Sequence, residues 1–166
     1  MYVLVTAASR HGSTTEVAAT VGEVLRTAGH DVRVLLPSEV SSLAGYEAAV
    51  IGSGIYTARW LEPARELVQR ERVALAKIPV WLFSSGPVGV PPKPLEIPSD
   101  AQSLARMIRA RDHRVFPGLV EKRRLGFGER ALMAAVRAPE GDFRPWAEIE
   151  AWAREIVEEL RAPAIG

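Results

Sequence analysis

Short runs of apolar, mostly β-branched residues alternate with amphipathic stretches along most of this chain. The first run, residues 2–7, suits a strand that is buried on both faces of a parallel sheet. The stretch after it carries one apolar stripe at helical spacing: Val17, Val21, Val24, Leu25 and Ala28. Gly29 is placed to end that helix. The alternation predicts an α/β fold, a doubly wound parallel sheet with helices on both faces.

The same pattern divides the rest of the chain into elements. Five strands are predicted, at residues 2–7, 32–36, 48–53, 80–83 and 115–120. Helices are predicted from residue 13, around Pro63, and at 103–111, 129–137 and 146–160, with a proline-rich loop at 86–99. Pro117 and Gly118 suit a bulge or a break in the last strand. No internal repeat or long linker is visible, so residues 1–162 are expected to form a single domain.

The segment between the first strand and the first helix is rich in hydroxyl groups. It comprises Ser9, Arg10, His11, Gly12, Ser13 and Thr14. Open α/β sheets bind ligands at this position, and a helix N-terminus offers unpaired N–H groups and a partial positive charge. The segment therefore predicts a phosphate site. The plainer alternative is that Ser13 and Glu16, at capping-box spacing, only cap the helix.

The composition of this loop indicates which phosphate ligand it suits. A Walker loop needs a Lys-Ser or Lys-Thr after glycine, and a dinucleotide loop needs three glycines, whereas this loop has only Gly12. A terminal monophosphate needs many donors around one group, which favours FMN over NAD.

Several other classes of site are excluded or disfavoured. The chain has no cysteine, so electrons in any redox reaction must be carried by a bound cofactor. The three histidines lack metal-site spacing, and no metal is expected. A net charge of +1 gives no case for nucleic-acid binding. The chain has no GxSxG motif, which disfavours a serine hydrolase. No aspartate follows the first or the third predicted strand, which disfavours a phosphoacceptor domain.

The loop resembles the FMN phosphate loop of flavodoxins. It is most similar to the branch that contains the quinone-dependent protoporphyrinogen IX dehydrogenases, whose loop reads Ser-Thr-Arg-Asp-Gly-x-Thr. This chain departs from that pattern at Ala8, where a hydroxyl is lost, and at His11, where a carboxylate is replaced. The resemblance implies a flavodoxin-like five-stranded sheet of order 2-1-3-4-5 and FMN as the cofactor.

The resemblance also implies which segments hold the isoalloxazine ring. In flavodoxins the ring lies between the loops after the third and fourth strands. The residues at those positions here are Ser53, Gly54, Ile55 and Tyr56, and Ser84, Ser85, Gly86, Pro87, Val88 and Gly89. Tyr56 or Trp60 is placed to stack on the ring. Ordinary packing is the alternative for both aromatic residues and is favoured for Trp60, while Trp81 is expected in the core.

Residues 121–145 carry a second resemblance, to the family-specific segment before the last helix. Trp146 matches the tryptophan of the family's Thr-Asp-Trp entry into that helix. The basic cluster Lys122-Arg123-Arg124, followed by apolar residues up to 137, suits peripheral contact with an anionic membrane surface or the carboxylates of a porphyrinogen. A solvated arginine-rich face is the alternative.

The leading expectation is an FMN-dependent oxidoreductase that resembles protoporphyrinogen IX dehydrogenase and passes electron pairs from a porphyrinogen, or another small-molecule donor, to a quinone such as menaquinone. The alternative is a flavodoxin-type electron carrier, although such carriers tend to be acidic. No side chain has the spacing of a required acid or base, so no catalytic residue is named.

With no signal peptide and no membrane-spanning run, a cytoplasmic location is expected, with the inner face of the membrane as an open alternative. Homo-oligomer formation is also open.

Overall fold

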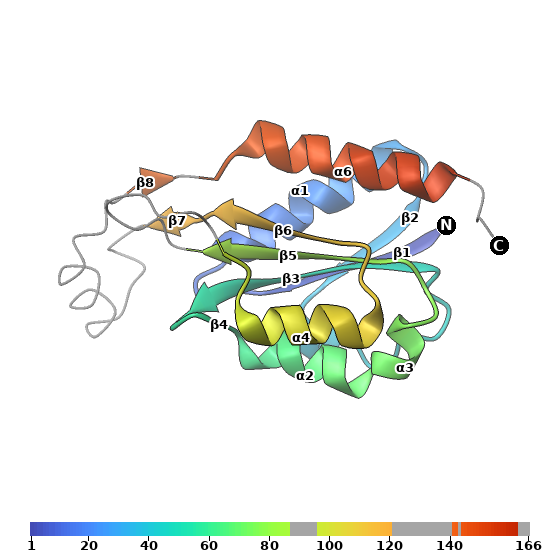
Figure 1. Ribbon diagram of the computed structural model, residues 1–166. Coiled ribbons are helices and arrows are strands. Elements are labelled where there is room, and N and C mark those ends of the chain that lie inside the picture. The colour runs from blue at the N-terminus through green and yellow to red at the C-terminus, as the bar shows by residue number, and fades with distance from the viewer. Residues whose placement is uncertain (87–95, 121–140, 143, 163–166) are drawn as a thin grey trace.

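The computed structural model describes residues 1–86, 96–120, 141–142 and 144–162 (Figure 1). Several predictions lie outside these residues. They concern Pro87, Val88 and Gly89 of the fourth-strand loop, the basic cluster 122–124, and the helix at 129–137. None of the helices within the described residues is long and apolar enough to cross a bilayer.

A central sheet of five parallel strands organises the molecule. The strands are β1 (Tyr2–Ala8), β2 (Asp31–Leu35), β3 (Ala48–Tyr56), β5 (Val80–Gly86) and β6 (Asp112–Pro117). They lie in the order β2-β1-β3-β5-β6, which confirms the order expected for the five main strands. The short strand β4 (Arg59–Trp60) pairs antiparallel with the end of β3. Beyond the sheet, β7 (Leu119–Val120) pairs with β8 (Gly141–Asp142).

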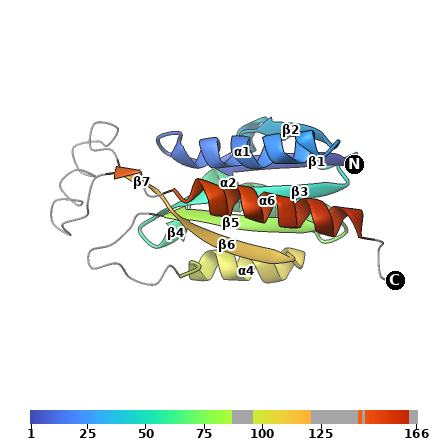
Figure 2. The ribbon, with the colours of Figure 1, turned by 90° about the horizontal axis from the view of Figure 1, so that it is seen from above.

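Helices cover both faces of the sheet, as Figures 1 and 2 show. One face carries α1 (Ser13–Thr27) and α6 (Trp146–Arg161). The other carries α2 (Glu62–Arg70), α3 (Arg72–Leu75) and α4 (Ser99–Ile108), and a single 3-10 turn, η1 (Pro37–Glu39), follows β2. Because neighbouring residues of a strand point to opposite faces, Val3 and Val5 join the core under α1 and α6, while Leu4 joins the opposite core.

The predicted packing of the first helix is confirmed, and the last helix forms where it was predicted. Val17, Val21 and Leu25 of α1 are fully buried against the sheet, and Gly29 follows the helix with φ +98°. In α6, the Trp152 indole lies edge-on between Phe83 and Phe116, with ring centroids 6.0 and 5.7 Å away. Trp81 is 1% exposed and belongs to the same core, as expected.

The predicted element ends are less accurate, chiefly at the carboxyl ends of the central strands. β3 continues to Tyr56 and β5 to Gly86, so residues expected in loops are paired strand ends, with Ser53 opposite Ser84. The fifth strand, predicted at 115–120, instead begins at Asp112 and ends at Pro117, and Gly118 breaks it from β7. Helix α4 starts at Ser99, after Pro98, rather than at 103.

One glycine in β3 is required by close packing. A Cβ built on Gly52 would lie 2.1 Å from Cζ of Phe83 on the neighbouring strand. The Phe83 ring therefore lies across the backbone of β3, where no side chain fits. The two strands run side by side toward the same edge, where Gly54 of β3 pairs with Ser85 of β5.

Candidate functional site

The loop between β1 and α1 brings two main-chain N–H groups to one point. Gly12 is the N-cap residue of α1 and has φ +90°, a left-handed conformation that glycine adopts without strain. The Ser9 hydroxyl oxygen accepts hydrogen bonds from the N–H of Gly12, at 2.9 Å, and of Thr14, at 3.3 Å. Since these donors converge on one oxygen at a helix N-terminus, the loop has the geometry of an anion-binding site.

The capping box expected from Ser13 and Glu16 is not formed. The N-cap is Gly12, no side chain caps α1, and Ser13 is the first helical residue. The left-handed turn at Gly12 is the physical reason, because it places Ser13 one position too far along the helix to cap it. The Glu16 carboxylate instead pairs with Arg144, which lies 128 residues away in sequence.

The end of β3 forms a second wall beside this loop. Thr14 is 2% exposed, and its hydroxyl oxygen would lie only 3.2 Å from a Cβ built on Gly54. The Thr14 side chain therefore points at the backbone of β3. Gly54 in turn pairs with Ser85 of β5, so the loop and the ends of both central strands meet at one edge.

A tight hairpin follows Tyr56. Thr57 and Ala58 form its turn with φ values of +49° and +59°, unusual for residues with side chains. Tyr56 is 37% exposed, and the Arg10 guanidinium lies 4.0 Å from the centroid of its ring. This cation–π contact joins the predicted phosphate loop to the predicted ring loop.

Buried hydrogen bonds fix the hairpin to the sheet. Trp60 is 2% exposed, as the packing interpretation predicted, and its indole N–H donates to the Ser84 hydroxyl at 2.7 Å. The Ser53 hydroxyl accepts from the N–H of Leu61 at 2.9 Å. The side chains of Ser53 and Ser84 thus hold β4 in place, and only their main chain lies at the edge of the site.

The last two described residues of the fourth-strand segment also lie at this edge. Ser85 is 5% exposed, and a Cβ built on Gly86 would lie 3.0 Å from the Ile55 side chain. Ile55 and Gly86 are therefore in close contact across the two strand ends. The structure thus brings together the loop 9–14, residues 53–56 and residues 84–86, and Pro87, Val88 and Gly89 are outside the described residues.

His113 is a partly buried polar residue that the sequence patterns did not single out. Its Nε2 lies 2.7 Å from the Ser84 hydroxyl oxygen, and its ring lies edge-on to Trp60. Burial lowers the pKa of His113 to about 4, outweighing the opposite effect of Asp112. The pair does not form a nucleophile–base site, because Ser84 is fully buried and its oxygen already accepts from Trp60.

Arg144 is the other residue whose role the sequence did not reveal. It lies two residues before Trp146, the first residue of α6. Its side chain is 7% exposed and contacts Asp142, Glu16 and the carbonyl oxygen of Ser13. The close spacing of Asp142 and Arg144 is visible in the sequence, but their partners on α1 come from the opposite end of the chain.

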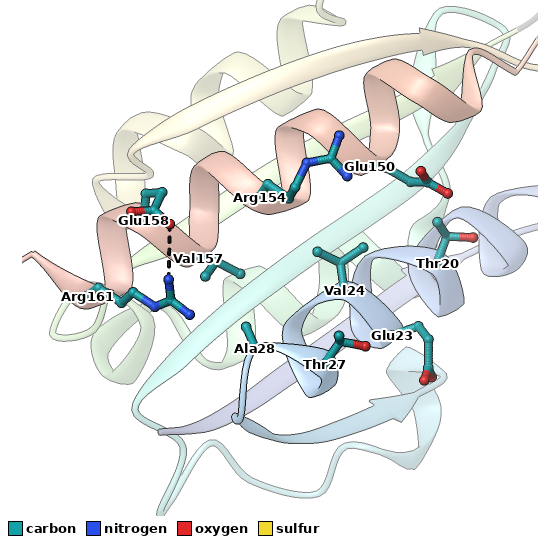
Figure 3. A pocket seen from close by; sticks show the side chains of 10 residues that line it. All are labelled: Thr20, Glu23, Val24, Thr27, Ala28, Glu150, Arg154, Val157, Glu158 and Arg161. Atoms are coloured by element: carbon teal, nitrogen blue, oxygen red, sulfur yellow. Dashed lines mark hydrogen bonds and ion pairs between the residues drawn. The ribbon is translucent and has the colours of Figure 1, made fainter.

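A separate concavity lies between α1 and α6 (Figure 3). Val24 and Val157 lie on its inner side, and Glu158 and Arg161 pair at 3.2 Å at its rim. It is formed by the second half of α1, away from the loop 9–14. This concavity is therefore not part of the site at the strand ends.

Comparisons with known structures show the same architecture. A flavodoxin from the domain Archaea matches with a TM-score of 0.66 and 17% identity, covering 98% of this chain and 100% of that one. A mutant flavodoxin from Pseudomonas aeruginosa matches with a TM-score of 0.67 and 16% identity, covering 98% of this chain and 100% of that one. The rubredoxin oxygen:oxidoreductase of Desulfovibrio gigas matches with a TM-score of 0.64 and 13% identity, covering 96% of this chain but 36% of that one.

The sequence comparisons identify the family. No curated protein sequence gives a significant match. The family model described as a flavodoxin domain matches residues 4–144, which include the loop 9–14 and the strands β3 and β5. Homologues in this family bind FMN. This chain belongs to the flavodoxin domain family.

Proposed function

We propose that this chain binds FMN with its phosphate at the loop 9–14 and transfers electrons through the flavin. One observation carries the proposal: the N–H groups of Gly12 and Thr14 converge on one oxygen at the start of α1. In the free protein the Ser9 hydroxyl accepts both hydrogen bonds. A phosphate oxygen is a stronger acceptor, and the helix dipole favours its charge.

The residues around the loop fit a flavin mononucleotide. The Thr14 side chain packs against the backbone of β3 at Gly54, which brings the loop close to β3, and Tyr56 presents a partly exposed ring beside it. Bound FMN supplies the electron-accepting ring. The chain's own residues bind and orient it: the loop holds the phosphate, and Trp60 and Ser84 fix the hairpin that carries Tyr56.

No carboxylate occurs among the predicted site residues 9–14, 53–56 and 84–89. This composition supports a site whose protein groups contribute binding and electrostatics rather than acid–base catalysis. Two finer functions are compatible with it.

The first finer function is that of an electron carrier. The chain and the archaeal flavodoxin have nearly the same extent, with 98% and 100% coverage. Such a protein would exchange electrons with a partner protein and need no substrate pocket.

The second is an oxidoreductase similar to protoporphyrinogen IX dehydrogenase, with a porphyrinogen as donor and a quinone as acceptor. The loop Ser9-Arg10-His11-Gly12-Ser13-Thr14 and the basic cluster 122–124 support it by resemblance, and a net charge of +1 suits it better than an acidic carrier. Under this proposal, residues 122–137 would contact the membrane surface where quinones reside.

The deciding experiment is an absorption titration of the purified protein with FMN and with riboflavin. Tight binding of FMN and much weaker binding of riboflavin would support the phosphate site, whereas binding of neither would refute the proposal. The loaded protein is then mixed with protoporphyrinogen and a menaquinone analogue. Turnover would support the oxidoreductase, and its absence, with electron exchange to a reductase retained, would support the carrier. Sedimentation with anionic vesicles tests the membrane contact.

A further inference from the structure

Arg144 links the start of α6 to the predicted phosphate loop. Its guanidinium donates two hydrogen bonds to the Asp142 carboxylate, both at 2.8 Å. It also bonds to the Glu16 carboxylate and donates to the carbonyl oxygen of Ser13 at 3.3 Å. The guanidinium carbon lies 4.6 Å from the centroid of the Trp146 ring. Arg144 is thus held on every side and touches the loop itself.

The charges of this cluster matter because of where Glu16 lies. The N–H of Glu16 donates to the carbonyl oxygen of Gly12, so Glu16 is one helical turn from the point where the loop N–H groups converge. A phosphate bound there would carry up to two negative charges. Without Arg144, the carboxylate of Glu16 would lie near that phosphate without a compensating cation and would weaken phosphate binding.

The cluster is built to keep Arg144 charged and fixed. Hydrogen bonds to Asp142 raise the pKa of Arg144 further, and the same bonds lower the pKa of Asp142. The Arg144 side chain is 7% exposed, while Glu16 is 51% and Asp142 42% exposed. A planar guanidinium can serve two carboxylates and a carbonyl together, which a lysine cannot do equally well.

We propose that Arg144 is a positioning residue for FMN: held in place by Asp142, it fixes the Ser13 end of the phosphate loop and neutralises Glu16 beside the phosphate. This inference rests on the proposed function, since it assigns Arg144 to the same phosphate site. It concerns the phosphate alone, so riboflavin binding is expected to be independent of Arg144.

The test is a set of binding titrations at low salt with FMN and riboflavin. The variants are Arg144→Gln, Glu16→Gln and the double variant. Arg114→Gln is the matched control, because Arg114 also bridges two carboxylates, those of Asp112 and Glu155, at 2.8 and 2.9 Å. Circular dichroism and thermal unfolding of each variant check the fold.

Arg144→Gln is expected to weaken FMN binding by about tenfold, equal to about 1.4 kcal/mol, and to leave riboflavin binding within about twofold. The double variant is expected to regain most of the FMN affinity, and the effect of Arg144→Gln should shrink at high salt. Arg114→Gln should leave both affinities unchanged.

Two results would overturn the inference while leaving the proposed function intact. They are an unchanged FMN affinity in Arg144→Gln, and an equal loss of FMN and riboflavin affinity. A wild-type protein that binds no FMN would instead overturn the proposed function, and this inference with it. Should Arg144→Gln fail to fold, Arg144→Lys keeps the charge. It is expected to bind FMN within about threefold of wild type, and a larger loss would contradict the charge argument.

Discussion

At the scale of single residues, Ser9 and Thr14 carry the first prediction. The Ser9 oxygen holds the two loop N–H groups together, and the buried Thr14 hydroxyl faces the backbone at Gly54. We expect Ser9→Ala combined with Thr14→Val to weaken FMN binding at least about tenfold, since each lost hydrogen bond to a charged group contributes about 1.5–3 kcal/mol. A flavin fluorescence titration measures this. Thr20→Val, the same change further along α1, is the control, and an unchanged FMN affinity would remove these hydroxyls from the site.

Arg10 carries a prediction about the reduction potential. Its guanidinium lies over the Tyr56 ring, between the phosphate loop and the hairpin. Reduction adds negative charge to a bound flavin, and a nearby cation stabilises that charge. Arg10→Gln should therefore lower the midpoint potential of the bound flavin, measured by spectroelectrochemistry. Arg154→Gln, which removes the same charge from the exposed side of α6, should leave the potential unchanged. Equal potentials in all three proteins would show that Arg10 does not act on the flavin.

His113 makes stability depend on pH. Burial lowers its pKa from 6.5 to about 4, so between these values the unfolded chain binds a proton that the folded chain does not. The free energy of unfolding therefore falls as the pH drops through this window, by up to about 1.4 kcal/mol per pH unit. The stability of the His113→Asn variant lacks this pH-dependent contribution. Urea unfolding at pH 7 and pH 5 should show a wild-type advantage that shrinks by about 1–2 kcal/mol at the lower pH. If wild type and His113→Asn differed in free energy of unfolding by the same amount at both pH values, His113 would not be the source of the pH dependence.

At the scale of elements, Gly52 shows how packing between strands sets the edge of the site. A Cβ there would lie 2.1 Å from the ring of Phe83, which is fully buried. Gly52→Ala should destabilise the fold by about 1–3 kcal/mol through overpacking. Chemical denaturation measures the loss, and the double variant with Phe83→Leu should recover part of it. A Gly52→Ala protein as stable as wild type would mean that the strands separate without cost.

The elements also show which local patterns the sequence encodes well. The stripe of Val17, Val21 and Leu25 is set by helical periodicity, a property of neighbouring residues, and it packs as predicted. The predicted strands stop at residues 53 and 83, too early for β3 and β5, because the residues that follow, Gly54 and Ser84, look like loop residues. The strands continue because the ladder pairs Ser53 with Ser84 and Gly54 with Ser85, and because the Ser53 and Ser84 hydroxyls bond to Leu61 and Trp60.

At the scale of the whole molecule, the alternation of strands and helices predicted the fold class, and the resemblance to flavodoxins implied the order of the five main strands. The long-range polar contacts were not predictable. Arg144 with Glu16 and His113 with Ser84 join distant parts of the chain, and no local spacing relates their positions. The same long-range bonds tie the site to the overall stability of the fold.

This connection gives the last prediction, which concerns ligand-linked stability. A ligand that binds only the folded state stabilises it by about 2.7 kcal/mol at a concentration one hundred times its dissociation constant. For a chain of 166 residues this corresponds to a rise in Tm of about 5–10 °C. FMN should produce that shift in differential scanning fluorimetry or calorimetry, and riboflavin at the same concentration a much smaller one. The variant with Ser9→Ala and Thr14→Val should lose most of the FMN shift, measured against its own Tm without ligand, which the loss of the Ser9 hydrogen bonds is expected to lower. Equal shifts from FMN and riboflavin would mean that the flavin ring alone is recognised, because the loop would then contribute nothing through the phosphate.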